Sequence, residues 1–560
     1  MTSSSGRSLG SSLPLFLIVA YFALSYILFP LYSLFRESLL PASGAISINA
    51  YRDLLRPSLF EATFNSLLIS LLSVLGSALV GTFLAYVLHF VDFRGKSFLA
   101  RVLLVPLALP PLVGVISFLF LIGESGMLSR ILSWLFGVST SFFTVSGWTG
   151  IVLVHIYSFY VYFYLFVSSA LSQLDGNSLD ASASLGATRL RTIRRILLPM
   201  LTPSLVAASL MTFMACMASF SAPLLFGGST RFLTLEIYTA KLNGDNSGAA
   251  ATAILLTLIS ILMLMSLRWW QSRNRYLMET KGAGRPSSLR HAAVTQAILI
   301  FVTVGLALLF ALPIVTIVVL SFVTEGSWTY QIFPHSFTAM NYGRLFYSPN
   351  LLTPLMNSVL MAIAATIVVA LVGVMASYLV VRKRFVGKKL LDLLLTLPYG
   401  IPGTVIAVGL ILSFNHSSFF SFQTILTGTV WIMPIAYAVR NLPLLYRSTT
   451  AGLEGLSPSL YEAAEVLGSS GARTFRTVVL PLILPSILSG ALLVFINSAG
   501  EFVSSILLYS YDTKPISVEI LSQLRLFNIG GAAVCSTLLM ALVLIAVAAS
   551  RRIFKSALTM

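Results

Sequence analysis

Two polar segments that stand 282 positions apart hold the side chains of this chain best suited to specific recognition. Each has a carboxylate followed by alanine, then a glycine, then arginines, then a Leu-Pro pair. The residues concerned are Asp180, Ala181, Gly186, Arg191, Arg194 and Pro199 in the first segment, and Glu462, Ala463, Ala464, Gly468, Arg473, Arg476 and Pro481 in the second. Because one polar pattern occurs twice in an apolar chain, we expect two equivalent binding sites (sockets) for two copies of a partner.

The local chemistry of each segment predicts a helix, a glycine elbow and a second helix. A carboxylate near a helix start is favoured by the helix dipole, and glycine supplies the left-handed residue that ends a helix. Pro199 and Pro481 then open the next apolar run, where a missing N–H costs little. The arginines alone would suit lipid anchoring. However, lipid anchoring does not require the same Gly-to-Pro distance in both segments.

The chain has no sequence signature for ATP hydrolysis. A phosphate-binding loop needs Gly-x-x-x-x-Gly-Lys-Ser/Thr, and Gly95-Lys96-Ser97 has Phe90 where the first glycine would stand. No zinc-protease helix, nucleophile elbow or cysteine cluster is visible. We therefore expect no catalytic residue and no cofactor in this chain, with ATP and magnesium on a partner.

A few polar residues fall inside apolar runs. A charge at mid-membrane costs at least ~2.5 kcal/mol, so Glu501 either lines a cavity or hydrogen-bonds a neighbouring span. Hard cations prefer oxygen ligands, which makes Glu501 a candidate for a solute pathway. His155 and His416 suit structural roles, and Cys216 and Cys535 suit packing. No His or carboxylate cluster has metal spacing, so we expect no metal site.

Composition fixes the broad class. Of the 560 residues, 57% are hydrophobic and 9% are charged, whereas soluble domains carry about 25% charged residues. A membrane-spanning helix needs ~20 apolar residues. Twelve such runs are predicted, near 14–35, 61–88, 102–122, 147–170, 201–227, 248–268, 292–322, 353–381, 391–412, 422–446, 483–508 and 528–550. The first run resembles a signal peptide but is too long for one.

The net charge of +17 indicates orientation rather than nucleic-acid binding. With the N-terminus inside, most Lys and Arg fall in cytoplasmic segments, including the segment from Arg440 to Arg476. We therefore expect both termini and both polar segments in the cytoplasm, in contact with membrane lipid.

Further matches extend the duplication. Asn65-Ser66 matches Asn357-Ser358, Gly81 matches Gly373, and Pro106 and Pro110 match Pro398 and Pro402. We predict parallel six-span repeats over residues 1–270 and 292–560, joined by a cytoplasmic linker at 271–291.

At the two polar segments the chain resembles the permease family of binding-protein-dependent ABC importers. The signature loop of that family reads Glu-Ala-Ala, Gly, Leu-Pro, which Glu462-Ala463-Ala464, Gly468 and Leu480-Pro481 match. The first copy departs, with Asp180-Ala181-Ser182, so the two sockets need not be equal. The resemblance implies an all-α type I ABC importer permease fold of about twelve helices in a bacterial inner membrane. It implies loops that couple to two copies of a cytoplasmic ABC ATPase, and an extracytoplasmic solute-binding protein.

A single fused chain resembles the ferric-iron and thiamine permeases. The stretches Ser219–Pro223 and Glu501–Val503 are similar to ferric-iron permeases, which makes Ser219 and Glu501 pathway candidates and ferric iron the expected solute. Thiamine or another small solute is the alternative. A rival class is the ion-coupled secondary transporter, which also has parallel halves but would need more intramembrane ionisable pairs.

Overall fold

The computed structural model describes residues 13–40, 46–123, 126–139, 143–173, 181–182, 184–273, 292–328, 331–347 and 349–557. Within those ranges the secondary structure is helical, apart from an isolated bridge between Val323 and Phe337. The predicted all-α membrane fold is thus confirmed. The chain divides into two compact units. Unit 1 holds 1–54, 237–257 and 339–560, and unit 2 holds 55–236 and 258–338.

Unit 2 is organised around three long helices, α4 (Pro57–Phe90), α9 (Gly147–Ser172) and α12 (Leu198–Met217), which contact one another. Its buried core includes Leu84 of α4 and Tyr157, Tyr160 and Val161 of α9. The other helices are α5 (Lys96–Val102), α6 (Val105–Ala108), α7 (Pro111–Ile122), α8 (Met127–Phe136), α11 (Arg189–Thr192), the π-helical turn η4 (Ile193–Leu197), α13 (Ser221–Phe226) and α16 (Ala293–Ser321). Helices α14 (Leu233–Leu242) and α15 (Asn246–Arg273) contribute to both units.

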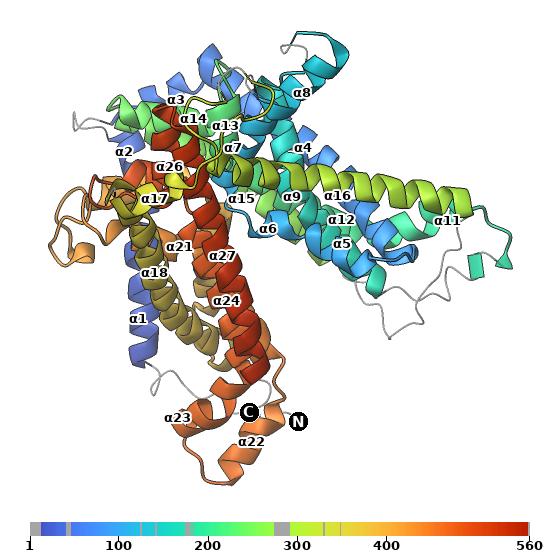
Figure 1. Cartoon of the computed structure of the whole chain (residues 1–560). Coiled ribbons are helices and arrows are strands. Elements are labelled where there is room, and N and C mark those ends of the chain that lie inside the picture. Colours follow the sequence, from blue (N-terminus) through green and yellow to red (C-terminus); the bar gives the residue numbers. More distant parts are fainter. Residues whose placement is uncertain are drawn as a thin grey trace. The chain divides into compact units, whose positions relative to one another are not determined.

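Unit 1 repeats this plan with α18 (Pro349–Arg382), α21 (Ile432–Glu454) and α24 (Leu480–Ala499), and α27 (Ile529–Ala557) packs against α24 (Figure 1). Equivalent helices therefore form the core of each unit. The other elements are α1 (Leu13–Ala23), η2 (Leu24–Leu28), α2 (Phe29–Leu39), α3 (Asn49–Asp53), α17 (Met340–Tyr347), α19 (Lys388–Thr396), η6 (Leu397–Gly400), α20 (Gly403–Phe414), η7 (Phe419–Ser421), α22 (Pro458–Val466), α23 (Gly471–Thr474), η8 (Phe475–Val479), α25 (Ser505–Leu508) and α26 (Ile516–Arg525).

The first helix of each sequence half packs on the core of the other half. The α1–α2 segment contacts α18 and α20 in unit 1, and α16 contacts α4, α5 and α7 in unit 2. Phe310 of α16 stacks on Tyr160 with ring centroids 4.6 Å apart. The compact units therefore differ from the predicted sequence halves, 1–270 and 292–560, which remain a prediction. Most of the predicted linker, residues 274–291, lies outside the described residues.

Ten helices of the described chain are long and apolar enough to span a membrane, or eleven if a bent pair counts as one span. The predicted run 422–446 appears instead as α21, which starts at Ile432 and carries polar residues. The runs 201–227 and 483–508 end early, because α12 stops at Met217 and α24 at Ala499. After each stop the chain forms short helices, α13 and α25, followed by α14 and α26.

The third span of each repeat is broken at the matched prolines. In unit 1 the chain bends by 112° between the helical segments Lys388–Gly400 and Gly403–Phe414. Pro402, between them, has an extended ψ of 145°. In unit 2 the chain breaks at Leu109 and Pro110 before α7 begins. Proline removes a backbone donor and restricts the residue before it to extended conformations, which explains both breaks.

The matched Asn-Ser pairs anchor the segment that precedes α14 or α26. Asn65 donates from Nδ2 to the carbonyl of Arg231 at 3.1 Å, and Ser66 accepts from the N–H of Leu233 at 3.0 Å. Likewise, Asn357 donates to the carbonyl of Lys514 at 3.1 Å and Ser358 accepts from the N–H of Ile516 at 2.9 Å.

An ion pair completes the anchor in each unit. In unit 2 Arg231 pairs with Glu236 at 3.4 Å, and in unit 1 Lys514 pairs with buried Glu519. Burial raises the pKa of Glu236, an effect that Arg231 opposes. The duplication therefore preserves a hydrogen-bonded anchor that fixes the segment after the fifth span.

Alanine substitution at the matched glycines Gly81 and Gly373 is expected to destabilise the protein to different extents. A Cβ at Gly81 would meet the carbonyl of Tyr160 and lie 2.6 Å from the Cβ of Phe163, so the backbone must shift. A Cβ at Gly373 would lie 2.7 Å from the Cδ2 of Leu445, a side-chain tip that can rotate. We expect Gly81→Ala to destabilise by about 1–3 kcal/mol and Gly373→Ala by clearly less, measured by thermal unfolding in detergent. Equal decreases in the unfolding temperature of the two variants would contradict the difference in packing around Gly81 and Gly373.

Candidate functional site

The two predicted coupling loops end their first helix in the same way. Gly186 and Gly468 adopt left-handed φ values of +72° and +75°. The N–H of Ala187 bonds to the carbonyl of Ser182 at 3.1 Å, and the N–H of Ser469 bonds to the carbonyl of Ala464 at 2.9 Å. This is the 6→1 bond of a Schellman cap, which needs a left-handed residue at the glycine position. The glycine elbow predicted from sequence therefore has one geometry in both units.

Each loop buries a small polar face and leaves its charged face in the open. Thr192 and Thr474 are buried, and the hydroxyl of Thr192 bonds Ser182 at 2.7 Å. The arginines Arg191, Arg194, Arg473 and Arg476 are exposed, as are Ala181, Glu462, Ala463 and both glycines. Asp180 lies outside the described residues. The described residues of the two loops thus expose cations and one carboxylate.

An apolar side chain stands beside the glycine elbow in both loops. Leu185 is 86% exposed and Leu467 is 85% exposed, at equivalent positions. Exposed leucines rimmed by charges are typical of a protein-interaction site. Sequence reasoning did not single out these leucines, although their place directly before the matched glycines could have indicated them.

The loops join the next span through a π-helical turn rather than a break. Turns η4 and η8 occupy equivalent positions, and the N–H groups of Leu198 and Leu480 bond five residues back, to Ile193 and Phe475. In an α-helix the rings of Pro199 and Pro481 would crowd the carbonyl four residues back, and the wider turn relieves that clash. The prolines are second in α12 and α24, so they start these helices within a continuous helical segment.

The first helix of the second predicted coupling loop, α22, is held to α18 of the same unit through Tyr461. The guanidinium of Arg382 lies 4.0 Å from the centre of the Tyr461 ring and donates to the carbonyl of Leu453 at 2.9 Å. Burial raises the pKa of the Tyr461 hydroxyl, and the adjacent Arg382 opposes that shift. Arg382 is at the last turn of α18, so movement of α22 would be transmitted to α18 through this contact.

The pathway candidate Glu501 lies directly after α24, in the break before α25. Its carboxylate accepts from Nη1 of Arg440 at 2.6 Å and from the N–H of Ser504 at 2.9 Å. The hydroxyls of Ser505 and Ser517 donate to its carbonyl at 2.6 and 2.7 Å. Glu501 thus makes the hydrogen bonds to neighbouring elements that were the alternative to a cavity-lining role.

Arg440 is the residue of this site that sequence reasoning did not single out. The charge pattern assigns it to a cytoplasmic segment, and it lies in the first half of α21 and faces the break in the third span. A Cβ at Gly403 would collide with its Nη1, so a larger residue at 403 would displace the guanidinium from this position. An arginine inside an apolar run was the signal that could have found it.

The other pathway candidate, Ser219, occupies the position equivalent to Glu501 in unit 2. Its hydroxyl bonds Nε2 of His155 at 2.9 Å, and Nδ1 of His155 bonds the hydroxyl of Ser73 at 3.0 Å. Thr234 donates to the carbonyl of Ser219 at 2.9 Å, as Ser517 does to Glu501. His155 is buried with two partners, which fits its expected structural role. The equivalent sites are thus neutral in unit 2 and charged in unit 1.

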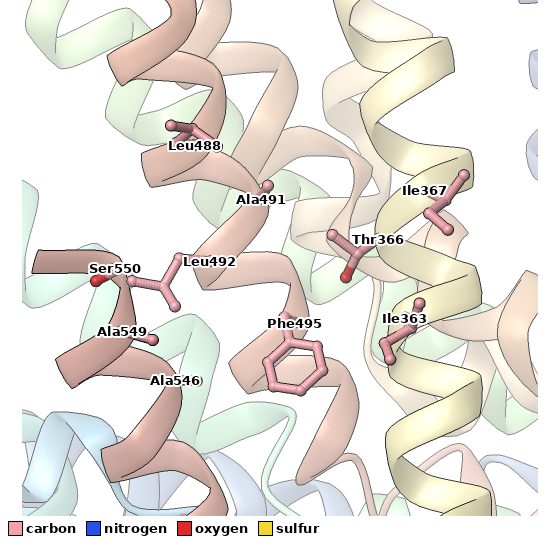
Figure 2. Close-up of a pocket in the computed structure, with 10 residues that line it drawn as sticks. All are labelled: Ile363, Thr366, Ile367, Leu488, Ala491, Leu492, Phe495, Ala546, Ala549 and Ser550. Carbon is pink, nitrogen blue, oxygen red and sulfur yellow. The ribbon is translucent and has the colours of Figure 1, made fainter. Parts of the chain in front are cut away.

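A groove in unit 1 is too apolar to serve a polar solute. Side chains of α18, α24 and α27 line this groove, as Figure 2 shows. The space between them is about 270 Å³. The hydroxyls of Thr366 and Ser550 bond carbonyls of their own helices, so they are already paired. Ligand sites combine apolar walls with converging polar groups, which this groove lacks. Its chemistry matches a lipid acyl chain.

Comparison with known proteins agrees with this geometry. The family described as the binding-protein-dependent transport system inner membrane component matches residues 77–276 and 370–559. A probable ABC transporter permease protein of Sinorhizobium fredii is 28% identical over 511 residues, 90% of this chain and 89% of the relative. A ferric transport system permease protein of Actinobacillus pleuropneumoniae is 29% identical over 454 residues, 78% of this chain and 62% of the relative. A sulfate transport system permease protein of Salmonella typhimurium is 29% identical over 202 residues, 35% of this chain and 73% of the relative.

Each family match contains the second part of the first core helix, the other two core helices and one glycine-elbow loop, so the duplicated geometry and the duplicated match coincide. The match covers more than half of the chain, and the family is one of multi-pass inner-membrane permeases that work with a solute-binding protein and an ATPase. The chain belongs to the binding-protein-dependent transport system inner membrane components, and it carries two copies of that component in one polypeptide.

Proposed function

We propose that this chain is the complete pore-forming permease of an ABC importer that moves ferric iron into the cytoplasm. The observation that carries the proposal is the pair of coupling loops with one cap geometry, Gly186 and Gly468 at the same left-handed conformation. An importer with two ATPase subunits needs one such loop for each subunit, and this chain supplies both loops. Ferric iron is supported by the long match to a ferric permease.

Each loop would receive one copy of a cytoplasmic ABC ATPase. The carboxylates Asp180 and Glu462, the following alanines and the exposed leucines would dock the ATPases, while the arginines hold the loops at the membrane surface. Pro199 and Pro481 would stiffen the passage into α12 and α24. ATP and magnesium belong to the ATPases, and this chain requires no cofactor or metal of its own. The proposal places both termini in the cytoplasm.

The outer ends of the units would receive a solute-binding protein, with Ser219 and Glu501 on the pathway that the solute follows. A second candidate solute is an oxyanion, because the sulfate permease matches one half. Among the described residues, Arg440–Glu501 is one ionisable pair between predicted spans, whereas an ion-coupled secondary transporter would need several. ATP would therefore supply the driving force.

The test is transport by the purified complex. The chain is co-purified with its partner ABC ATPase and reconstituted with the solute-binding protein in vesicles that contain ATP. We expect uptake of radioactive ferric iron that stops when ATP is omitted and persists when the proton gradient is dissipated. Uptake that follows the proton gradient would refute an ABC importer, and uptake of sulfate alone would refute the solute.

A further inference from the structure

The Arg440–Glu501 pair is charged, but its two partners are not equally covered. The Glu501 side chain is 7% exposed and the Arg440 side chain is 28% exposed. One oxygen of the carboxylate is occupied by Arg440 and by the N–H of Ser504. Among the described residues, Glu501 is the hydrogen-bond partner of the guanidinium. The member of the pair that is more exposed is therefore the positively charged Arg440.

The exposed side of Arg440 must meet water. Arg440 is eight residues into α21, about 12 Å from its start at 1.5 Å per residue, and it falls inside the predicted membrane run 422–446. A charge at that depth is costly unless it faces water. Asn497, one helical turn before Glu501 in α24, is a second exposed polar side chain at this level. Its amide bonds only within its own helix, to the carbonyl of Leu493 at 2.8 Å.

The pair also presents its charge from a fixed position. Gly403 lies against the guanidinium, and the hydroxyl of Ser504 donates to the carbonyl of Gly403 at 3.3 Å. Tyr437 bonds Ser505 at 2.7 Å and Asn441 bonds Ser498 at 3.1 Å, so α21 is tied to the α24–α25 break on both sides of the pair. At equivalent positions unit 2 has Ser158 and Ser219, which carry no charge.

We propose that Arg440 is the charge-selective residue of the solute pathway, held outward by Glu501, and that the solute passes this point with a net negative charge. This inference rests on the proposed transport function and names the class of its solute. Ferric iron would pass with anionic ligands attached, and an oxyanion would pass as it is. A bare cation would meet repulsion from a guanidinium that cannot lose its proton.

The test measures local potential without requiring transport. Asn497→Cys is introduced in the full-length permease with its ATPase, in membrane vesicles. The cysteine is treated with an anionic and with a cationic methanethiosulfonate. The reaction rate of each reagent with the cysteine is divided by the rate of the same reagent with a small free thiol in solution. The native Cys216 and Cys535 are buried, so the chain with Asn497 intact is the background control.

We compare the ratio of the anionic to the cationic reaction rate at Asn497→Cys. We expect this ratio to be about twofold higher with the native pair than with Arg440→Gln and Glu501→Gln together. With Glu501→Gln alone we expect it to be about fivefold higher, because a nearby unit charge in water changes each rate by about twofold. High salt should abolish the preference in the unaltered pair, which keeps the test decisive if a charge variant does not fold. A cysteine unreactive with both reagents would overturn the proposal. A preference unchanged by the double substitution or by salt would overturn it as well.

Failure of the transport function is distinguishable from failure of this inference. Absence of ATP-dependent iron uptake in the unaltered complex would refute the proposed function and leave the reagent preference as measured. Uptake that survives Arg440→Gln with Glu501→Gln at the unaltered rate would instead refute selection by Arg440.

Discussion

Replacing Gly468 by valine is expected to lower ATP-driven uptake on the order of tenfold, because the left-handed conformation costs a β-branched residue about 1–3 kcal/mol. Gly468 has φ +75°, and a Cβ added there would have no neighbour within 4 Å, so conformation and not volume is the obstacle. The Schellman cap would open and α22 would lose its fixed direction. Uptake and stimulation of ATP hydrolysis by the binding protein are measured at matched membrane expression.

Two controls separate the cap from general damage. Gly468→Asn should retain most uptake, because asparagine tolerates the left-handed region. Gly305→Val changes a glycine of α16 with an ordinary φ and no close neighbour, and should have no effect. Gly186→Val should reproduce the loss in the other loop. Normal uptake and ATPase stimulation in Gly468→Val would show that the elbow is not needed for coupling.

Deleting residues 1–45 is expected to reduce the folded permease by more than about tenfold, since buried packing worth several kcal/mol is lost. The deletion removes α1, which contacts α18, and α2, which contacts α20, both in unit 1. Phe29 contacts Phe420 with ring centroids 4.9 Å apart, and Ser413 bonds Ser33 at 2.8 Å. In lipid no hydrophobic effect compensates for lost helix packing. Fluorescence-detected size exclusion of the tagged chain measures the monodisperse fraction.

A matched pair of point variants tests the same contact without a deletion. A Cβ at Gly409 would lie 3.2 Å from Leu34 and from Pro30, whereas a Cβ at Gly305 has open space. Gly409→Leu should lower the unfolding temperature and Gly305→Leu should leave it unchanged. If both variants match the unaltered chain, α2 does not pack on α20 as described.

The sequence by itself determined the fold class and the existence of two repeats. Composition excluded a soluble domain, because no core could hide so much apolar surface from water. The glycine elbows were predictable because a left-handed residue at a helix end is a local requirement, independent of what packs on it. The prolines of the third spans were likewise readable, since proline breaks a helix wherever it stands. Family membership followed from the same local signals.

Tertiary structure alone decided which helices complete each core and which charges meet. The packing of α1–α2 on the second half and of α16 on the first half cannot be read from hydropathy, because the candidate spans are all strongly apolar. The ends of α12 and α24 differ from the predicted ones because the short helices after them are apolar too. The charge pattern did not show that Arg440 is paired, because a count of charges does not reveal which charges meet. Glu501 neutralises it across 61 residues, and such a contact depends on how α21 packs on the break after α24.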